Sequence, residues 1–356
     1  MSKELGHGVL PRAVALVSAA AVVLVALVVA GSAVGAALRS YATPFKYVAL
    51  GDSFSAGEGV DPYFRDGFDP TTGRQGAIDN GCHRSSRAYS TWVQRPADAM
   101  TLYAIASGGG KPGLLGGKNK YGSDKNVRSA GGVRWASWAC SGAATENVLP
   151  KSLGGVPQQE AGQTRDRETQ LDSADLAGAD LVTLTIGGND AGFVGVLFSC
   201  AVSNCKTPAF ERGRTAIING TKPLLETVYR AVARKAPRAR VLVLGYPQLF
   251  PATKAEQSCA GLSLFSGEQN MLRKFGAQLN TTIEAAVKSV AKSGAKIEYV
   301  PVTARFAGHE ICGRKGPWIN GVGTTPSFLG GSFHPTLRGQ QDGYGRAVNA
   351  AVKRGR

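Results

Sequence analysis

Several short apolar runs, each followed directly by a turn of small residues, constrain the fold of this chain more than any other feature. The runs cover residues 47–50, 133–139, 180–186 and 240–244, and a further apolar run covers residues 296–302. Stretches with helical periodicity lie between the later runs and after the last one, at residues 224–236, 267–293 and 337–352. Strands that alternate with helices predict a mainly parallel sheet with helices on both faces. The carboxyl ends of parallel strands meet at one edge, so we expect the functional residues in the turns at that edge.

The N-terminus has the pattern of an export signal. Residues 13–30 are apolar or small and uncharged, Lys3 and Arg12 precede them, and small residues follow up to position 37. This order predicts a secretory signal peptide at residues 1–37 and a secreted, extracellular protein. The apolar run is long enough to span a bilayer, so a membrane anchor with the remaining chain outside is the alternative. No break in composition divides the rest, which predicts one domain over residues 44–356.

The cysteine content agrees with an oxidising compartment. An even number of cysteines follows the predicted signal, namely Cys82, Cys140, Cys200, Cys205, Cys259 and Cys312. No CxxC motif occurs, which argues against a zinc site, and histidines and carboxylates do not cluster at metal-ligand spacing. Three disulfides are therefore expected. Cys200 and Cys205 are close enough for a local loop, whereas spacing alone leaves the other pairings open.

The chain is strongly basic, with a formal net charge of +16. Such a field attracts polyanions, which include nucleic acid, anionic lipid headgroups and acidic cell walls. The basic residues are spread along the sequence and no nucleic-acid motif accompanies them. We therefore expect a monomeric secreted enzyme with a basic surface, attracted electrostatically to anionic membrane or cell-wall surfaces, and no nucleic-acid partner.

Ser53 is the candidate nucleophile. It lies in the turn Gly51-Asp52-Ser53 directly after the first apolar run, where backbone N–H groups and the start of a helix favour a developing negative charge.

A serine nucleophile needs a base, which is usually histidine. His334 is the strongest candidate because Pro335 suits the first turn of the last helix, which leaves the imidazole on a loop at the edge of the sheet. His7 precedes the apolar run, and His83 and His309 lie beside cysteines, which makes them weaker candidates.

Two further turns offer hydrogen-bond donors for the oxyanion that forms during ester hydrolysis. Asn189, in Gly-Gly-Asn-Asp, follows the run at residues 180–186 and can supply a side-chain amide. Gly142, in Cys-Ser-Gly-Ala, follows the run at residues 133–139 and can supply a backbone N–H. Either turn alone is ordinary, but both occur at strand ends in a chain that also contains Gly-Asp-Ser. Asp52 and Asp190 are interpreted as residues that shape their turns.

These four blocks, in this order, resemble the SGNH, or GDSL, hydrolases over the chain from about residue 45 to its end. The Cys82-His83-Arg84-Ser85 segment and Phe333-His334-Pro335 are most similar to the secreted bacterial esterase and lipase branch with three disulfides. The resemblance implies a three-layer α/β/α sandwich with a mainly parallel sheet of about five strands, which is flavodoxin-like. It also implies Ser53 as nucleophile, His334 as base, and an oxyanion hole formed by the N–H groups of Ser53 and Gly142 and the Asn189 amide. The implied disulfides are Cys82–Cys140, Cys200–Cys205 and Cys259–Cys312.

One position departs from the pattern of this family. Many members carry Asp three residues before the histidine, where it orients the imidazole as in a triad. This chain has Gly331 there, and no acidic residue lies between Glu310 and Asp342. We therefore expect a Ser53–His334 dyad in which the backbone carbonyl of Gly331 accepts the imidazole N–H.

The sequence thus predicts a secreted serine esterase or lipase that hydrolyses carboxylic, fatty acyl esters through an acyl-enzyme, with no cofactor and no metal. A polysaccharide O-acetyl esterase or a phospholipase on the same fold is the alternative, since the sequence does not reveal the length of the acyl pocket. A non-catalytic surface-binding protein is the alternative from another class, and it rests on the absence of Asp at position 331.

Overall fold

The computed structural model describes most of the chain after residue 44, within the unit Phe45–Arg356. The described ranges are residues 45–64, 67–69, 74–78, 81–94, 127–130, 133–160, 163–164, 168–202, 205–252, 266–322 and 330–354. The predicted signal segment at residues 1–37 lies outside them. Among the described residues, no helix is long and apolar enough to cross a membrane.

A six-stranded sheet forms the centre of this unit, with the strand order β10-β9-β8-β1-β5-β4. Its strands are β1 (Phe45–Gly51), β4 (Val127–Ala130), β5 (Val133–Ser137), β8 (Leu181–Thr185), β9 (Arg240–Leu244) and β10 (Ile297–Val300). All neighbours pair in parallel except β4, which pairs antiparallel with β5 at the edge. The predicted α/β class with about five parallel strands is therefore confirmed.

Burial on both faces explains why the strand sequences are almost continuously apolar. Every residue of β8 is buried, and so are residues 47–51 of β1. Hydrogen-bonded pairs of polar groups also lie inside the sheet, as where the hydroxyls of Tyr47 and Thr183 lie 2.8 Å apart. The apolar runs predicted as strands at residues 133–139, 180–186, 240–244 and 296–302 all contain a strand of the sheet.

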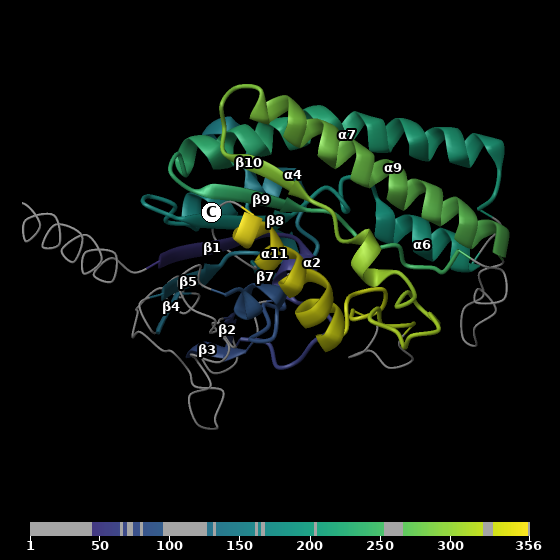
Figure 1. Cartoon of the computed structure of the whole chain (residues 1–356), viewed down its shortest axis with the longest axis horizontal. Helices are drawn as coiled ribbons and strands as arrows, with labels where there is room; N and C mark the ends of the chain where they lie inside the picture. Colours follow the sequence, from purple (N-terminus) through teal and green to yellow (C-terminus); the bar gives the residue numbers. More distant parts are fainter. Residues whose placement is uncertain are drawn as a thin grey trace, which may run out of the picture. The chain divides into compact units, whose positions relative to one another are not determined.

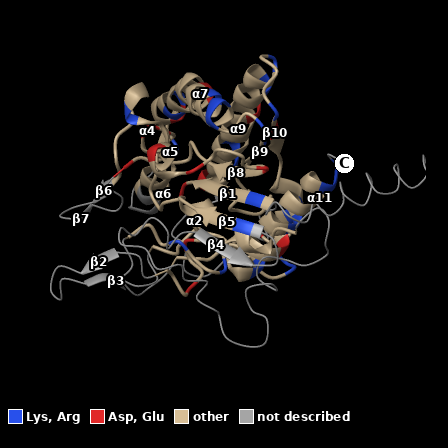
Figure 2. Cartoon of the chain, turned by 90° about the vertical axis from the view of Figure 1, so that its left-hand side faces the viewer, with Lys and Arg blue, Asp and Glu red and all other residues tan. Residues whose placement is uncertain are grey.

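Helices cover the two faces of the sheet (Figure 1). The long helices α7 (Pro208–Lys235) and α9 (Ser266–Ala291) lie on one side, and α11 (Arg346–Arg354) lies on the other (Figure 2). α7 begins where the Thr207 side chain accepts the N–H of Phe210, and Pro208 occupies the first turn, where its missing N–H costs nothing. The three layers match the predicted sandwich.

The remaining elements are short. They are α2 (Ser53–Ala56), β2 (Gly67–Asp69), β3 (Arg74–Ile78), η1 (Tyr89–Trp92), α4 (Thr145–Val148), η3 (Lys151–Leu153), β6 (Gln159–Glu160), β7 (Gln163–Thr164), α5 (Gln170–Ser173), α6 (Phe193–Val202), η4 (Thr303–Phe306) and the π-helical η5 (Gly339–Gly345). The low-complexity region at residues 107–132, which reads as a loop, contains β4, and its remaining residues lie outside the described ranges. Pairing with β5 overrides the weak strand propensity of β4.

Candidate active site

The end of β1 places Ser53 at the carboxyl edge of the sheet. Gly51 has a φ of 118°, and a Cβ at this position would lie 2.1 Å from the carbonyl oxygen of Thr185 in β8. Only glycine fits this close approach without strain. Asp52 then forms the N-cap of α2 by accepting the N–H of Phe54 at 3.1 Å, so Ser53 is the first residue of the helix.

Asp52 itself is buried beneath the turn. Its carboxylate accepts the Thr185 hydroxyl at 2.7 Å and the phenol of Tyr246. Burial raises the pKa of Asp52 to about 6, against the hydrogen bonds from Thr185, Tyr246 and Phe54, which lower it. The contacts join α2, β8 and the loop after β9, which agrees with the interpretation of Asp52 as a residue that shapes the turn.

His334 lies beside Ser53, although the two are far apart in the sequence. Its Nε2 atom is 2.8 Å from the Ser53 Oγ, and its ring lies 5.1 Å from the ring of Phe54. Burial lowers the pKa of His334, and the nearby Glu58 carboxylate and the Ser332 carbonyl oppose this shift. The neutral imidazole, which can accept a proton, is therefore favoured at neutral pH. The distance between the two side chains is within the reach that a serine nucleophile and a histidine base require.

The carbonyl that orients His334 belongs to Ser332 rather than to Gly331, so the predicted residue was wrong. The Nδ1 of His334 donates to the Ser332 carbonyl oxygen over 2.9 Å. The Gly331 carbonyl accepts the backbone N–H of His334 at 3.2 Å, so it closes the turn rather than contacting the ring. Phe333, which lies between Ser332 and His334, has a left-handed φ of 63°. Phenylalanine rarely adopts this conformation, so the sequence does not predict the turn.

The oxyanion donors predicted from the sequence lie at the same edge of the sheet as Ser53. β1 lies between β5, which leads to Gly142, and β8, which leads to Asn189. The Asn189 Nδ2 donates to the Ala143 carbonyl at 2.8 Å, which fixes the amide against the Gly142 loop and leaves its second N–H for another acceptor. Within the described residues, the N–H groups of Ser53 and Gly142 donate to no backbone acceptor. Gly142 adopts a φ of 79°.

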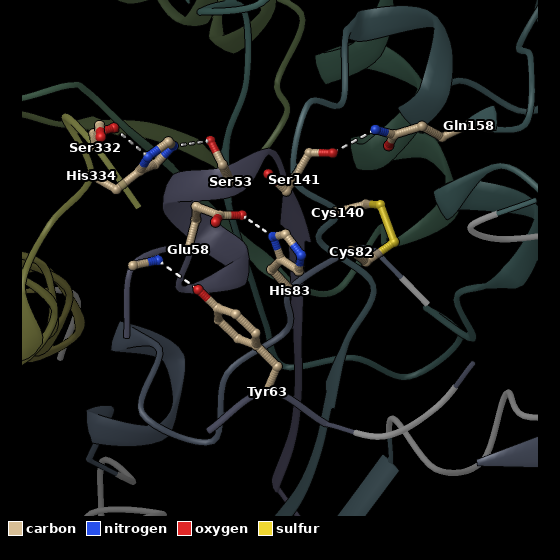
Figure 3. A network of polar contacts seen from close by, with 11 residues as sticks. Ser53, Glu58, Tyr63, Cys82, His83, Cys140, Ser141, Gln158, Ser332 and His334 are labelled. Carbon is tan, nitrogen blue, oxygen red and sulfur yellow. Dashed lines mark hydrogen bonds and ion pairs between the residues drawn. A yellow bond between two sulfur atoms is a disulfide. The ribbon is translucent and has the colours of Figure 1, made fainter. Parts of the chain in front are cut away.

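Two disulfides lie wholly within the described residues. Cys82 is bonded to Cys140, and Cys200 is bonded to Cys205. Cys312 is also disulfide-bonded, and Cys259, its partner in the implied pairing, lies outside the described residues. The Cys82–Cys140 bond joins the segment that carries His83 to the loop that carries Ser141 and Gly142 (Figure 3).

The weaker histidine candidates have other contacts. His309 stacks on Trp318 with 3.8 Å between the ring centroids, and its Nδ1 lies 2.7 Å from the Gly316 carbonyl oxygen. His83 contacts Glu58, a buried acid near His334 (Figure 3). Glu58 follows Ser53 in the same glycine-rich motif, but the sequence pattern gives no signal that its carboxylate lies near His334. Among the described residues, no group of His, Cys, Asp and Glu side chains could hold a metal ion.

The site geometry agrees with similarities to known proteins. The family model described as "GDSL-like Lipase/Acylhydrolase family" matches residues 104–341, a stretch that includes Gly142, Asn189 and His334. A lipase from Streptomyces rimosus is 33% identical over 312 residues, which cover 86% of each protein. Lipase 1 from Streptomyces coelicolor is 29% identical over 330 residues, which are 91% of this chain and 94% of the relative.

Solved structures show the same relationship. The extracellular lipase from Streptomyces rimosus superimposes with a TM-score of 0.55 at 29% identity, and the phospholipase A1 from Streptomyces albidoflavus NA297 with a TM-score of 0.54 at 28% identity. Each alignment covers 86% of this chain and 99% of the other. The chain belongs to the GDSL-like lipase/acylhydrolase family, and it is a carboxylic ester hydrolase.

Proposed function

We propose that this protein is a secreted serine esterase or lipase that hydrolyses fatty acyl esters through an acyl-enzyme on Ser53. The observation that carries the proposal is the distance of 2.8 Å between the Ser53 Oγ and the His334 Nε2. His334 accepts the hydroxyl proton as Ser53 Oγ attacks the ester carbonyl, and then donates it to the leaving alcohol. Water, deprotonated by His334, then attacks the acyl-enzyme. The bond between the acyl carbon and Ser53 Oγ breaks, the carboxylic acid is released, and His334 returns the proton to Ser53 Oγ.

The remaining groups of the site support the charges that these steps create. The tetrahedral oxyanion is placed against the N–H groups of Ser53 and Gly142 and the amide of Asn189. The Ser332 carbonyl accepts the Nδ1 proton of His334, which keeps Nε2 unprotonated and directed at Ser53. A dyad supported by a carbonyl therefore needs no acid at position 331.

Substitution of the dyad tests the catalytic proposal. Ser53→Ala and His334→Ala should each lower the kcat for p-nitrophenyl octanoate by about a thousandfold or more. Ser152→Ala, at an exposed serine of η3, provides a comparison variant that retains the dyad. A fluorophosphonate should label the wild type and leave Ser53→Ala unlabelled. Normal turnover by either dyad variant would refute the mechanism, and a wild type that resists the label would favour a non-catalytic binding protein.

The similarity to a phospholipase A1 favours a second candidate substrate, an acyl ester of a phospholipid. Rates on acetate, octanoate and palmitate esters and on phosphatidylcholine vesicles separate the candidates. We expect hydrolysis of the octanoate and palmitate esters, whereas activity confined to acetate would indicate an O-acetyl esterase. A larger rate on the vesicles than on the simple esters would indicate a phospholipase.

Export of the protein is the other part of the proposal. Its support is the apolar run at residues 13–30, the disulfides of the described domain and the similarity to an extracellular lipase. N-terminal sequencing of the protein from culture medium should find a start near position 37. A protein that stays with the membrane at full length would indicate an anchor instead.

A further inference from the structure

A second carboxylate lies within the active site. Glu58 follows α2, whose C-cap Gly57 has a φ of 91° and turns the chain back toward Ser53. The N–H of Glu58 donates to the Ser53 carbonyl over 3.0 Å, and its side chain is only 3% exposed. A carboxylate removed from water to this extent is costly unless it is hydrogen-bonded or paired with a positive charge.

The partners of Glu58 hold it in the ionised form. The Nδ1 of His83 lies 2.5 Å from its Oε2 (Figure 3). The Ser141 side chain is also hydrogen-bonded to the Glu58 carboxylate. Burial alone would raise the pKa of Glu58, but the hydrogen bonds from His83 and Ser141 and the charges of His334 and His83 hold this pKa below its ordinary value. Glu58 is therefore negatively charged when the enzyme works near neutral pH.

The carboxylate is fixed in place as well as charged. The Tyr63 ring stacks on the His83 ring, with 4.7 Å between the centroids and 17° between the planes. The hydroxyl of Tyr63 accepts the N–H of Gly59 over 2.9 Å, which ties the same tyrosine to the residue after Glu58. The Cys82–Cys140 disulfide joins the residues adjacent to His83 and Ser141, the two side chains that bind the carboxylate.

Glu58 packs against the turn that carries His334. A Cβ placed on Gly330 would lie 3.0 Å from the Glu58 Oε1, and one placed on Gly59 would lie 3.3 Å from the His334 Cβ. The turn at residues 330–334 therefore lies directly against Glu58. The charge of Glu58 raises the pKa of His334, in opposition to the larger effect of burial. The Nδ1 of His334 donates to Ser332, so Glu58 acts on the imidazole through its electric field.

We propose that Glu58 is a positioning residue for His334, a carboxylate held by His83 that stabilises the imidazolium formed during hydrolysis. It takes the electrostatic role of the acid that is absent from position 331. The inference rests on the proposed Ser53–His334 mechanism. In that mechanism His334 becomes positively charged as Ser53 attacks, and a fixed negative charge nearby favours that state without moving.

Other titratable groups pack around the same elements. Asp52 at the start of α2, Tyr89 in η1, Tyr246 after β9 and Tyr344 in η5 are buried. Burial, and to a smaller extent the charge of Asp52, raises the pKa of each of the three tyrosines. Arg84, next to His83, is buried and donates to the Ala139 carbonyl. The charges with the largest effect on the pKa of His334 are those of Glu58, which raises it, and His83, which lowers it. A change in the pH profile on substitution of Glu58 therefore reports on this group.

The first test replaces Glu58 by Gln, which keeps the size and hydrogen-bonding capacity of the side chain but removes its charge. We expect kcat for p-nitrophenyl octanoate to fall about tenfold with KM changed by less than about twofold, because the stabilised charge exists only in the transition state. The acid limb of the kcat/KM profile should move to lower pH, since the pKa of His334 loses the contribution that raises it. Glu284→Gln, an exposed acid paired with Lys288 on α9, is the control and should match the wild type.

A matched pair of variants at His83 covers the case in which Glu58→Gln fails to fold. His83 has a φ of 49°, a conformation that Asn and Gly tolerate. His83→Asn keeps a donor close to the position of Nδ1, and we expect nearly wild-type kcat. His83→Gly removes the donor, so Glu58 gains a proton more readily and loses its charge. We therefore expect kcat to fall as it does for Glu58→Gln.

Active sites are counted with a fluorophosphonate and the Tm is measured for every variant, so that loss of folded protein is separated from loss of rate. A lower Tm with unchanged kcat per labelled site and an unchanged pH profile would show a purely structural role and overturn the inference. Equal kcat values for His83→Gly and His83→Asn would also overturn the inference. Failure of the proposed function looks different, because the wild type would then be inactive or Ser53→Ala would remain active.

Discussion

The side chain of Gln170 forms two hydrogen bonds with the backbone of Gly51, as a neighbouring strand would do. Its Oε1 accepts the Gly51 N–H at 2.8 Å, and its Nε2 donates to the Gly51 carbonyl at 2.8 Å. Gly51 is the last residue of β1, and Ser53 follows two residues later. The side chain of Gln170, which begins the short helix α5, therefore fixes the turn that carries Ser53.

The first prediction concerns this contact. Gln170→Ala leaves the buried Gly51 N–H without a partner, whereas the Gly51 carbonyl retains the N–H of Cys140 at 3.0 Å. An unsatisfied buried donor costs about 1–3 kcal/mol, so the free energy of unfolding should fall by that amount. Denaturation in urea measures it. Gln278→Ala, which removes an exposed hydrogen bond to Asn219, is the comparison and should cost less than about 0.5 kcal/mol. If both variants lost the same free energy of unfolding, the hydrogen bonds of Gln170 to Gly51 would stabilise the fold no more than an exposed hydrogen bond does.

The parts of the fold that could be predicted from sequence are those dictated by local pattern. The strands of the sheet are continuous apolar runs, and the turn after β1 contains the residues that its backbone requires, as Gly51 shows. Gly142 and Asn189 were placed at the correct edge because parallel strands end together. The Ser53–His334 contact followed from chemistry and from family resemblance rather than from any local signal.

The contacts made by side chains and by irregular turns could not be predicted. The choice between the Gly331 and Ser332 carbonyls depends on the left-handed conformation of Phe333, which its sequence does not favour. Gln170 lies in a polar stretch that reads as an ordinary surface helix, yet it is only 4% exposed. Glu58 and His83 were not recognised as a pair because their contact is set by the disulfide and by the return of the chain after α2.

Asp52 gives a prediction for the pH dependence of stability. Its folded pKa of about 6 is above its ordinary value of 3.8, so the folded state binds the proton more tightly than the unfolded state does. The stability from this group is complete below pH 3.8 and is lost as the pH rises through about 6. The shift corresponds to about 3 kcal/mol. Asp52→Asn cannot ionise. The difference in the free energy of unfolding, wild type minus variant, should therefore fall by about 2 kcal/mol between about pH 4 and pH 7. A constant difference would contradict the raised pKa.

His334 gives a prediction for the pH dependence of activity. Catalysis needs its neutral form, and burial holds its pKa below the ordinary value of 6.5. The wild-type kcat/KM for a soluble p-nitrophenyl ester should thus exceed half of its plateau value at pH 6.5 and decline only at lower pH. Measurements between about pH 4 and pH 8 at constant ionic strength check this. The Ser53–fluorophosphonate reaction, followed over the same range, should show the same limb, since it uses the same base. A midpoint above pH 6.5 in both would contradict the direction of the shift.

The two described disulfides close loops of very different length, which predicts unequal effects on stability. Cys82 and Cys140 are separated by 58 positions, and Cys200 and Cys205 by 5. In the chain-entropy model, replacing the first pair by alanine costs about 4 kcal/mol and replacing the second about 2 kcal/mol. The first replacement should also lower kcat, because this bond joins the His83 segment to the loop of Ser141 and Gly142. Urea denaturation of the two double-alanine variants, with kcat per labelled active site, separates the two effects. If both variants lost the same stability and kept the same kcat, the Cys82–Cys140 bond would have no role in the geometry of the site.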